Sequence, residues 1–407
     1  MEFGFTEEQE KLRKEVHEFF LNELPEDYVE GLGSMSKELQ SFWMQLQKKA
    51  GDKRYITPGW PKEYGGMGLS GVEQAIVAEV EQSWGVLWPN FEGYIFLGPG
   101  LMLFGTEEQK KEFLPPIIRG EVLWMEGFTE PDAGSDSANI NLRAVEDGEY
   151  YVLNGQKTWI TGWHKPDWIF CQTRTEDTVP KHRGLTLFMV KADTPGITYR
   201  PLPGMGFATQ NELFFDDVRV PKKNILGQLN NGFYHMMAIF EYERAGVGGG
   251  AGAQAALRRF IHYCREEKKN GKPLIEDPEV REKLARMAVE NEMHRLIGWH
   301  AQWWFANRER LGPKPYDFSG YWAKQLPTKH AEWMLNIMGL YGQLRAGSKY
   351  VKYDGRLERS WLSGRAMHHE AGTIEINKNV LAQRGLGLPR IPAKFNMTIA
   401  QELSKGG

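Results

Sequence analysis

The spacing of apolar and polar positions changes twice along the chain, and these changes divide it into helical, β and helical parts. The segment after Thr6 repeats apolar residues at amphipathic-helix spacing, and this pattern recurs to about residue 120. Strand-like spacing follows, and helical spacing returns beyond Gly232 and continues to about Arg384. We therefore predict an α+β fold with an N-terminal helical domain, a middle antiparallel β-domain and a C-terminal helical bundle, over residues 1–120, 121–235 and 236–407.

The middle part contains several short segments rich in β-branched and aromatic residues. Leu185–Val190, Ile197–Leu202 and Glu212–Val220 are separated by turn residues at strand-like intervals. The segment Tyr150–Thr161 holds Asn154-Gly155 between β-rich flanks, which predicts a hairpin with a type I′ turn at that pair. Because no long helical pattern interrupts these segments, we expect an antiparallel sheet rather than βαβ units.

A polar loop precedes this hairpin and is the first candidate for ligand binding. Residues Met125–Asp136 include small hydroxyl residues, two glycines and a proline, which favour a loop over helix or strand. Its backbone N–H groups and hydroxyls suit the polar edge of a ligand, and Trp159 and Thr161 would add a flat indole and a hydroxyl. The pattern alone is equally compatible with an ordinary β-domain that carries a polar loop.

Glu243 is the most informative carboxylate because it falls among apolar positions of the helix after Gly232. At 100° per residue one narrow stripe of that helix holds Met236, Phe240, Glu243, Val247, Gly250 and Gln254. A carboxylate on such a face lines a cleft or is paired, and burial would raise its pKa toward the range of a general base. A structural pair with Arg244 or a distant cation is the alternative.

Two further motifs invite a ligand interpretation. Gly246, Gly248 and Ala251 match G-x-G-x-x-A, but they neither follow a strand nor open a βαβ unit, so we predict close helix packing instead of dinucleotide binding. The run His368-His369-Glu370 lacks the spacing of metal ligands on a helix, and we expect no metal there. Thr373 is a plausible N-cap for a helix that runs to Arg384.

Composition excludes several classes of protein. The net charge of −3, with 41% hydrophobic and 25% charged residues, argues against nucleic acid as a main partner. The longest apolar runs fall short of the roughly 20 residues that span a bilayer, and the N-terminus resembles neither a secretory signal nor a transit peptide. Cys171 and Cys264 are far apart in sequence, so we expect reduced thiols in a cytoplasmic protein.

Four long segments, in this order, resemble the acyl-CoA dehydrogenase family, and the similarity extends over essentially the whole chain. They are Phe128–Asp136, Leu153–Thr161, Phe214–Pro221 and Ala371–Pro389. The resemblance implies FAD held between the β-domain and the C-terminal bundle, with an acyl-CoA thioester stacked against the flavin. A carboxylate would remove the α-proton while hydride leaves the β-carbon for the flavin, which gives a 2-enoyl-CoA. An electron-transfer flavoprotein would then reoxidise the flavin.

The resemblance also assigns contacts residue by residue. The implied cofactor contacts are Glu126, Phe128, Thr129, Gly134, Ser135, Trp159, Ile160, Thr161, Thr373 and Glu375. The implied substrate contacts are Ser135, Tyr242, Arg244, Ala371 and Gly372. Among the cofactor contacts, Thr161 would lie near the flavin nitrogen that accepts hydride.

The family places its base at one of two positions. The commoner position directly precedes Gly-Thr in the C-terminal motif, and here it is occupied by Ala371, which cannot act as a base. The second position lies in a Glu-Arg pair on the long helix, as in isovaleryl-CoA dehydrogenase, and Glu243-Arg244 matches it. We therefore assign the base to Glu243, with Glu370 as the fallback. Since this placement accompanies bulky acyl groups in the family, we expect a branched, alicyclic or aromatic-substituted substrate.

At positions where the family contacts the adenine end of FAD, this sequence departs from the family pattern, and alternatives to the expected assembly and function stay open. Glu267 and Asn270 stand where the family often has Arg and Phe, and Asn336 stands where it has Gln. Either the nearby lysines remake these contacts or a different partner subunit supplies them, so a heterotetramer competes with the expected homotetramer. A non-catalytic partner subunit is one alternative function. An acyl-CoA oxidase is another, although such enzymes are usually longer.

Overall fold

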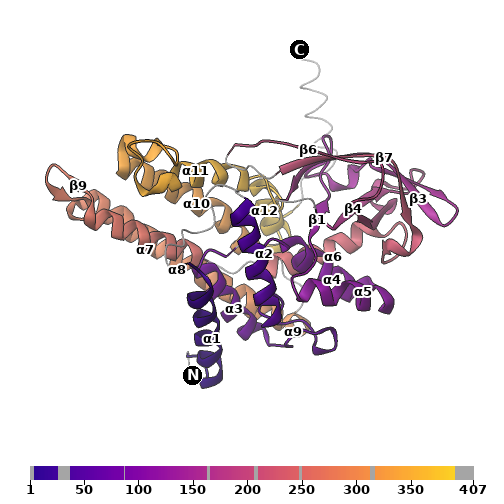
Figure 1. Ribbon diagram of the computed structural model, residues 1–407, viewed down its shortest axis with the longest axis horizontal. Helices are drawn as coiled ribbons and strands as arrows, with labels where there is room; N and C mark the ends of the chain where they lie inside the picture. Colours follow the sequence, from indigo (N-terminus) through magenta and orange to yellow (C-terminus); the bar gives the residue numbers. More distant parts are fainter. Residues whose placement is uncertain are drawn as a thin grey trace, which may run out of the picture.

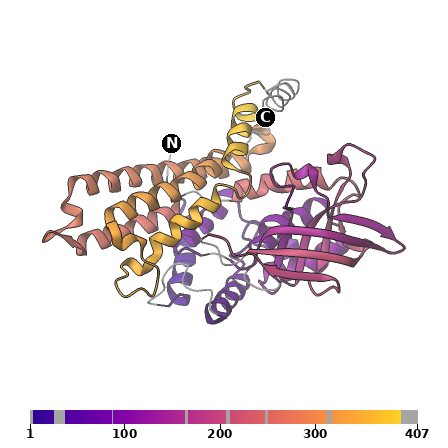
Figure 2. The same ribbon diagram turned by 90° about the horizontal axis from the view of Figure 1, so that it is seen from above.

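The computed structural model describes residues 4–25, 37–86, 88–162, 166–205, 210–246, 250–311 and 317–389. These residues form an elongated molecule with a β-sheet at one end and the α7–α8 helix pair extending to the other (Figure 1). The view from above shows the same separation, with the N-terminal helices beside the sheet (Figure 2). The helical–β–helical order and the fold class are as predicted from the sequence.

Side-chain caps define the starts of several helices in the N-terminal part. Thr6, Ser70 and Thr106 each form a capping box at the start of a helix. The helix that Thr106 caps continues through Pro115 and Pro116 to Ile118. The helices are α1 (Glu7–Glu23), α2 (Lys37–Asp52), α3 (Gly71–Ser83), α4 (Gly98–Phe104) and α5 (Glu107–Ile118), with a 3-10 turn η1 (Lys62–Tyr64) and a π-helical turn η2 (Gly93–Leu97).

The middle part is an eight-stranded sheet in the order β6-β7-β3-β2-β4-β5-β8, with β1 beside β4. Most neighbours are antiparallel, as expected, but β1 pairs with β4 in parallel and β2 meets β4 in parallel at Arg143 and Arg174, so the sheet is mixed. The strands are β1 (Trp124–Gly127), β2 (Arg143–Asp147), β3 (Tyr150–Thr161), β4 (Trp168–Arg174), β5 (Leu185–Lys191), β6 (Ile197–Pro201), β7 (Gln210–Pro221) and β8 (Ile225–Leu226).

The expected type I′ turn at Asn154-Gly155 does not form, and β3 runs straight through the pair. A bulge between β3 and β7 occupies this point instead, with Gly155 at φ 144°. The Asn154 amide exchanges two hydrogen bonds with Asp217 on β7, at 3.0 and 2.9 Å. The reversal between β2 and β3 lies earlier, at Gly148 (φ 58°). A bulge uses the conformational freedom of glycine as well as a turn does, which is why the local pattern misled.

The C-terminal part contains α6 (Gly232–Gly246), α7 (Ala251–Glu266), α8 (Pro278–Ala306), α9 (Arg308–Leu311), α10 (Asp317–Met338), α11 (Arg356–Met367) and α12 (Ile374–Val380), with a small hairpin of β9 (Lys268–Lys269) and β10 (Lys272–Pro273). One expectation is wrong here, because α6 ends at Gly246. Gly250 and Gln254 therefore do not continue the stripe of Glu243.

The glycines at this break explain its close packing, as the sequence predicts. A Cβ on Gly250 would lie 2.8 Å from the carbonyl oxygen of Asn291 and 3.0 Å from the backbone nitrogen of Arg295. A Cβ on Gly252 would lie 3.2 Å from the carbonyl oxygen of Gln82. The start of α7 thus packs backbone to backbone against α8 and α3.

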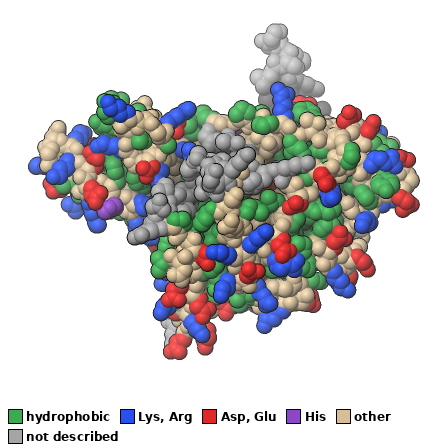
Figure 3. All heavy atoms as spheres, in the orientation of Figure 1, with side chains coloured by type: hydrophobic (Ala, Val, Ile, Leu, Met, Phe, Trp, Pro, Cys, Tyr) green, Lys and Arg blue, Asp and Glu red, His purple; other side chains and the backbone are tan. Residues whose placement is uncertain are grey.

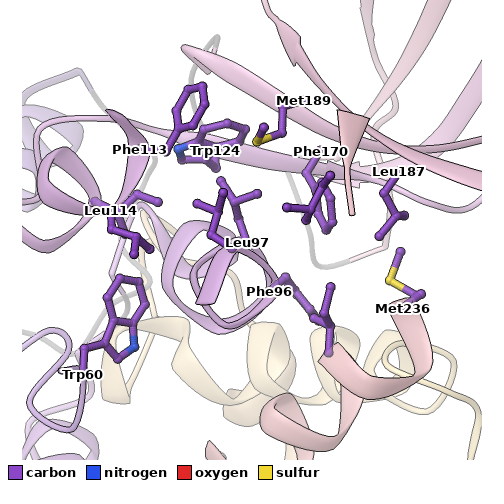
Figure 4. Close-up of a cluster of buried hydrophobic side chains, with 14 of the residues drawn as sticks. Trp60, Phe96, Leu97, Phe113, Leu114, Trp124, Phe170, Leu187, Met189 and Met236 are labelled. Atoms are coloured by element: carbon purple, nitrogen blue, oxygen red, sulfur yellow. The ribbon is translucent and has the colours of Figure 1, made fainter. Parts of the chain in front are cut away.

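One hydrophobic cluster joins the N-terminal helices, the sheet and α6. Leu97 and Leu114 come from helical segments, Phe170 and Leu187 from strands, and Met236 points from α6 toward Leu187 (Figure 4). Because α6 shares this cluster with the sheet, its position is fixed relative to the loop after β1. Among the described residues, no helix is both long and apolar enough to cross a bilayer.

Candidate active site

The loop after β1 is held by a buried ion pair. Lys157 on β3 has a fully buried side chain, and its Nζ lies 2.8 Å from Glu130 Oε1 and 3.1 Å from the carbonyl oxygen of Phe128. Glu130 also accepts hydrogen bonds from the backbone N–H groups of Asn141 and Leu142, at 2.6 and 2.8 Å. Removing one partner of such a pair costs about 3–5 kcal/mol. The loop is therefore a rigid support.

Trp159 presents its indole to solvent beside this loop. The side chain is 53% exposed, and the backbone has φ 58°, which is uncommon for a bulky residue. The pairing of β3 with β7 is irregular between Lys157 and Ile160, and this bulge contains Trp159. The backbone N–H of Thr158 donates to the carbonyl oxygen of Thr129 at 2.9 Å, so the bulge and the loop are joined. A strained, exposed aromatic residue on a rigid strand is typical of a ligand platform.

The other expected contacts of this region differ in their exposure to solvent. Phe128, Thr129 and Thr161 are half-buried, whereas Gly134 and Ser135 are exposed. Glu126 is half-buried on β1 and Ile160 is buried in the sheet. The threonine hydroxyls and the backbone N–H groups of the exposed loop are hydrogen-bonding groups that fit the edge of a flat heteroaromatic ring.

Helix α6 brings Glu243 toward this platform. Phe240, three residues before Glu243, lies with its ring centroid 6.1 Å from those of Phe128 and Phe96. The backbone of Glu243 lies in α6, while the side chains of Tyr242, Glu243 and Arg244 fall outside the described part of the structure. The helix turn that leads into Glu243 therefore packs directly on the loop after β1.

A second tight turn lies before α12. Ala371 (φ 45°) and Gly372 (φ 75°) both have left-handed backbone conformations and are exposed. Thr373 caps α12 as expected, since its Oγ1 accepts a hydrogen bond from the N–H of Ile376 at 3.2 Å. Hydrogen bonds from its own backbone N–H and from Thr373 lower the pKa of Glu375. Exposed Ala371 and Gly372 are available for ligand contact.

Lys324 on α10 holds this turn, and we did not identify it from the sequence. Its Nζ donates to the carbonyl oxygens of Glu370 (2.6 Å), Ala371 (3.0 Å) and Gly372. Helix α10 also contacts α6, so one helix supports both the turn and the helix of Glu243. The only hint in the sequence is a lysine that directly follows the apolar and aromatic run Tyr321-Trp322-Ala323.

Two carboxylates beside η2 have strongly raised pKa values. Burial raises the pKa of Glu81 and of Glu92 to about 8, although the indole N–H of Trp88 bonds Glu81 Oε1 at 3.2 Å and partly opposes the shift. The same burial, together with these carboxylates, raises the pKa of Tyr94. Phe96, on the same turn, contacts Phe128 with ring centroids 5.9 Å apart. The cluster therefore borders the platform without being part of it.

Comparisons with known proteins agree with this architecture. Family models for the acyl-CoA dehydrogenase N-terminal, middle and C-terminal domains match residues 6–121, 126–218 and 230–386. The acyl-CoA dehydrogenase FadE26 of Mycobacterium tuberculosis is 30% identical over 398 residues, which cover 96% of this chain and 99% of that protein.

Two solved structures are similar over nearly the whole chain. The ChsE4–ChsE5 complex of Mycobacterium tuberculosis has a TM-score of 0.84 and 29% identity, covering 96% of this chain and 100% of that one. The Tcur3481–Tcur3483 steroid ACAD has a TM-score of 0.86 and 29% identity, with the same coverage. With its three matched domains and its similarity to relatives along their full length, this chain belongs to the acyl-CoA dehydrogenase family of flavoprotein oxidoreductases, which act on CH–CH bonds.

Proposed function

We propose that this enzyme uses FAD to oxidise a branched, alicyclic or aromatic-substituted acyl-CoA to its 2-enoyl-CoA, with Glu243 as the base. Two observations together give the main support. Ala371 occupies the commoner base position, and Glu243 lies on a helix whose Phe240 packs on Phe128. Ala371 has no proton acceptor in its side chain. Glu243 then remains as the carboxylate that both the helical pattern and the family resemblance select.

The donor set of the platform supports FAD as the cofactor. A flavin ring is flat and has oxygen and nitrogen atoms along one edge, which suits the exposed indole of Trp159 and the hydroxyls of Thr129, Thr161 and Thr373. FAD, when bound, supplies the hydride acceptor of the reaction. The remaining residues that we assign to the cofactor are Glu126, Phe128, Gly134, Ser135, Ile160 and Glu375.

The chain itself supplies the proton chemistry and the position of the substrate. Glu243 takes the α-proton of the thioester, whose acidity rises when the carbonyl oxygen receives hydrogen bonds. Tyr242 and Arg244 lie next to the base in sequence, and we assign them, together with Ser135, to substrate contact. Ala371 and Gly372 would line the substrate at the second turn.

The residue at position 371 and two relatives support the proposed substrate class. An alanine in place of a carboxylate at position 371 leaves more room beside the thioester, which favours a substituted acyl group. The solved relative Tcur3481–Tcur3483 is named a steroid ACAD, and a steroid has a bulky alicyclic skeleton. A 3-(aryl)acrylate reductase of Clostridium sporogenes, 31% identical to this chain, is named for an aromatic compound. Both relatives support a ring-bearing substrate.

The same family membership supports the proposed partners and assembly. We propose an electron-transfer flavoprotein as the electron acceptor and a tetramer as the assembly, formed in the cytoplasm. Since ChsE4–ChsE5 and Tcur3481–Tcur3483 are each named as a pair, a heterotetramer is the specific alternative to a homotetramer.

Anaerobic flavin bleaching tests the proposal. The purified protein should be yellow, and its flavin absorbance should fall on addition of cyclohexanecarboxyl-CoA, 3-phenylpropionyl-CoA or isovaleryl-CoA, and more slowly with octanoyl-CoA. A colourless protein, or a flavin that none of these thioesters bleaches, contradicts the proposal. Fastest bleaching by octanoyl-CoA would contradict only the substrate class, and rapid peroxide formation in air would indicate an oxidase.

A further inference from the structure

Lys324 is a buried lysine whose ammonium group faces a ligand-binding turn. Its side chain is on α10, the residue is 4% exposed, and its three donors converge on consecutive carbonyl oxygens of Glu370, Ala371 and Gly372. An ammonium group has three rotatable donors on a compact centre, which suits three neighbouring acceptors. The contacts involve backbone atoms only, so they fix the course of the chain.

These bonds determine where the opposite side of each peptide points. Every peptide in the described chain is trans, and in a trans peptide the C=O of one residue and the N–H of the next point in opposite directions. When the carbonyls of residues 370–372 face Lys324, the N–H groups of Ala371, Gly372 and Thr373 face away from it. Within the described residues these N–H groups donate to no protein acceptor.

A second contact from α10 supports the same segment. Thr328, one helical turn after Lys324, lies with its Oγ1 3.2 Å from Nε2 of His368, at the start of the turn. The N–H of Ile374, the first residue of α12, donates to the carbonyl oxygen of His368 at 3.1 Å and so closes the turn. The turn is thus held at its start by Thr328 and along its backbone by Lys324.

We propose that Lys324 is a positioning residue, which directs the N–H groups of residues 371–373 toward the carbonyl oxygen of the bound acyl thioester. The inference rests on the proposed function, since it assigns a supporting residue to the same reaction. Negative charge grows on that oxygen while Glu243 removes the α-proton, and fixed backbone donors stabilise it without reorganising. Lys324 would touch neither substrate nor cofactor and would act through the turn alone.

The test compares Lys324→Met with Lys324→Arg and with Lys329→Met. Lys329 is on the same helix but is partly exposed and paired with Glu290, away from the turn. The first readout is kcat and KM with the panel thioester that bleaches the wild-type flavin fastest. The second is hydrogen exchange of the amides of Ile374, Ile376 and Asn377, which bond back to His368 and Thr373.

We expect Lys324→Met to lower kcat about 100-fold, as for loss of an oxyanion donor, with a smaller change in KM. Exchange of the three amides should rise at least about tenfold, because they open locally once the turn is released. Lys324→Arg keeps the charge but replaces the compact ammonium by a planar fork, and should lose about tenfold in kcat. Lys329→Met should match the wild type in both readouts.

Either of two results would overturn the inference: kcat of Lys324→Met within threefold of the wild type, or unchanged exchange of the three amides. If Lys324→Met does not fold, Lys324→Arg decides by the same criteria. If no thioester bleaches the wild-type flavin, the proposed function fails. Comparison of amide hydrogen exchange in Lys324→Met and Lys329→Met still decides whether the turn depends on Lys324.

Discussion

At the scale of single residues, the first question is which carboxylate takes the proton. Burial raises the pKa of Glu370, whereas the nearby charges of Lys324 and His369 lower it. Glu370 therefore has some features of a base, but it lies one residue away from the commoner base position. Glu243 coincides with the second base position of the family, and its helix packs on the loop that we assign to FAD.

Glu243→Gln and Glu370→Gln test this choice. Glutamine keeps the shape of the side chain but cannot accept the α-proton, so Glu243→Gln should lower the rate of anaerobic bleaching about 10³-fold. Its flavin content should equal that of the wild type, because Glu243 is not among the expected cofactor contacts. Glu370→Gln should change the rate less than about fivefold. Reversed effects of the two variants would move the base to Glu370.

The pair Glu81 and Glu92 gives a second prediction, on pH and stability. Their folded pKa of about 8 exceeds the ordinary 4.5, so the folded state binds more protons than the unfolded state between these values. The stabilisation is complete below pH 4.5 and is lost as the pH rises through 8. The double variant Glu81→Gln/Glu92→Gln should lose less in Tm than the wild type between pH 5 and 8.5, by a difference of a few degrees.

The matched control for this pair is Glu112→Gln, an exposed carboxylate on α5. It should follow the wild-type profile, since the removal of one solvent-exposed carboxylate changes stability little. If the double variant also follows the wild-type profile in scanning calorimetry, these carboxyls do not titrate in the proposed window.

Local sequence could predict residues in the loop and in the platform, but not the residues that support them. Thr129 and Trp159 lie in motifs with strong local signals. Lys324 acts on a turn 46 to 48 residues further along the chain. Nothing in its own surroundings reveals that contact, since it depends on the packing of α10 against α12. Long-range polar support of this kind requires the tertiary structure.

At the scale of elements, two Asn-Gly pairs show why a local pattern can give two outcomes. Asn270-Gly271 has φ values of 54° and 80° and forms the two-residue turn of the β9–β10 hairpin. Asn154-Gly155 sits inside β3, where the amide bonds Asp217 on the neighbouring strand. The neighbouring strand β7 decides between bulge and turn. The spacing of apolar residues thus predicted the helical and β parts, whereas the ends of the strands depended on pairing with neighbouring strands.

The break between α6 and α7 yields a prediction at the same scale. Gly250 and Gly271 have similar φ values, 74° and 80°, but nothing lies within 4 Å of a Cβ on Gly271. Gly271→Ala should therefore lose only about 1 kcal/mol, from its left-handed backbone. Gly250→Ala meets the backbone of Asn291 in addition, which should add about 1–3 kcal/mol. Because α6 carries Glu243, Gly250→Ala should also slow bleaching.

Urea unfolding of the two glycine variants measures this difference. Gly271→Ala is the control for the backbone conformation alone. Equal losses of stability in the two variants would mean that the break tolerates a shift, and that the close approach of α7 and α8 is not required.

At the scale of the whole molecule, the distribution of surface side chains bears on assembly. Acidic and basic side chains are interspersed over the face shown in Figure 3, in keeping with the net charge of −3. Helix α8 differs, since four large apolar residues on it are exposed: Val289 (61%), Met293 (47%), Leu296 (54%) and Trp303 (46%). Their spacing of four, three and seven places them on one side of the helix.

This apolar row on α8 predicts a self-association surface. A contiguous row of this kind is unfavourable in water and is commonly buried between subunits, and a second copy of the chain presents the same row for a two-fold contact. We expect the wild type to be a homo-oligomer in light scattering at micromolar concentration. Val289→Glu/Leu296→Glu should shift it to a smaller species, because the contact would bury two carboxylates without partners.

Leu103→Glu is the matched control, since Leu103 is a similarly exposed apolar residue on α4 (43%), outside the row. It should keep the wild-type mass, because a single exposed apolar residue is common on monomer surfaces. If the wild type itself is monomeric, the row does not join two copies of this chain. A mass that rises only when a second acyl-CoA dehydrogenase chain is added would assign the row to a heterologous partner instead. The double variant would then fail to bind that chain, while Leu103→Glu would still bind it.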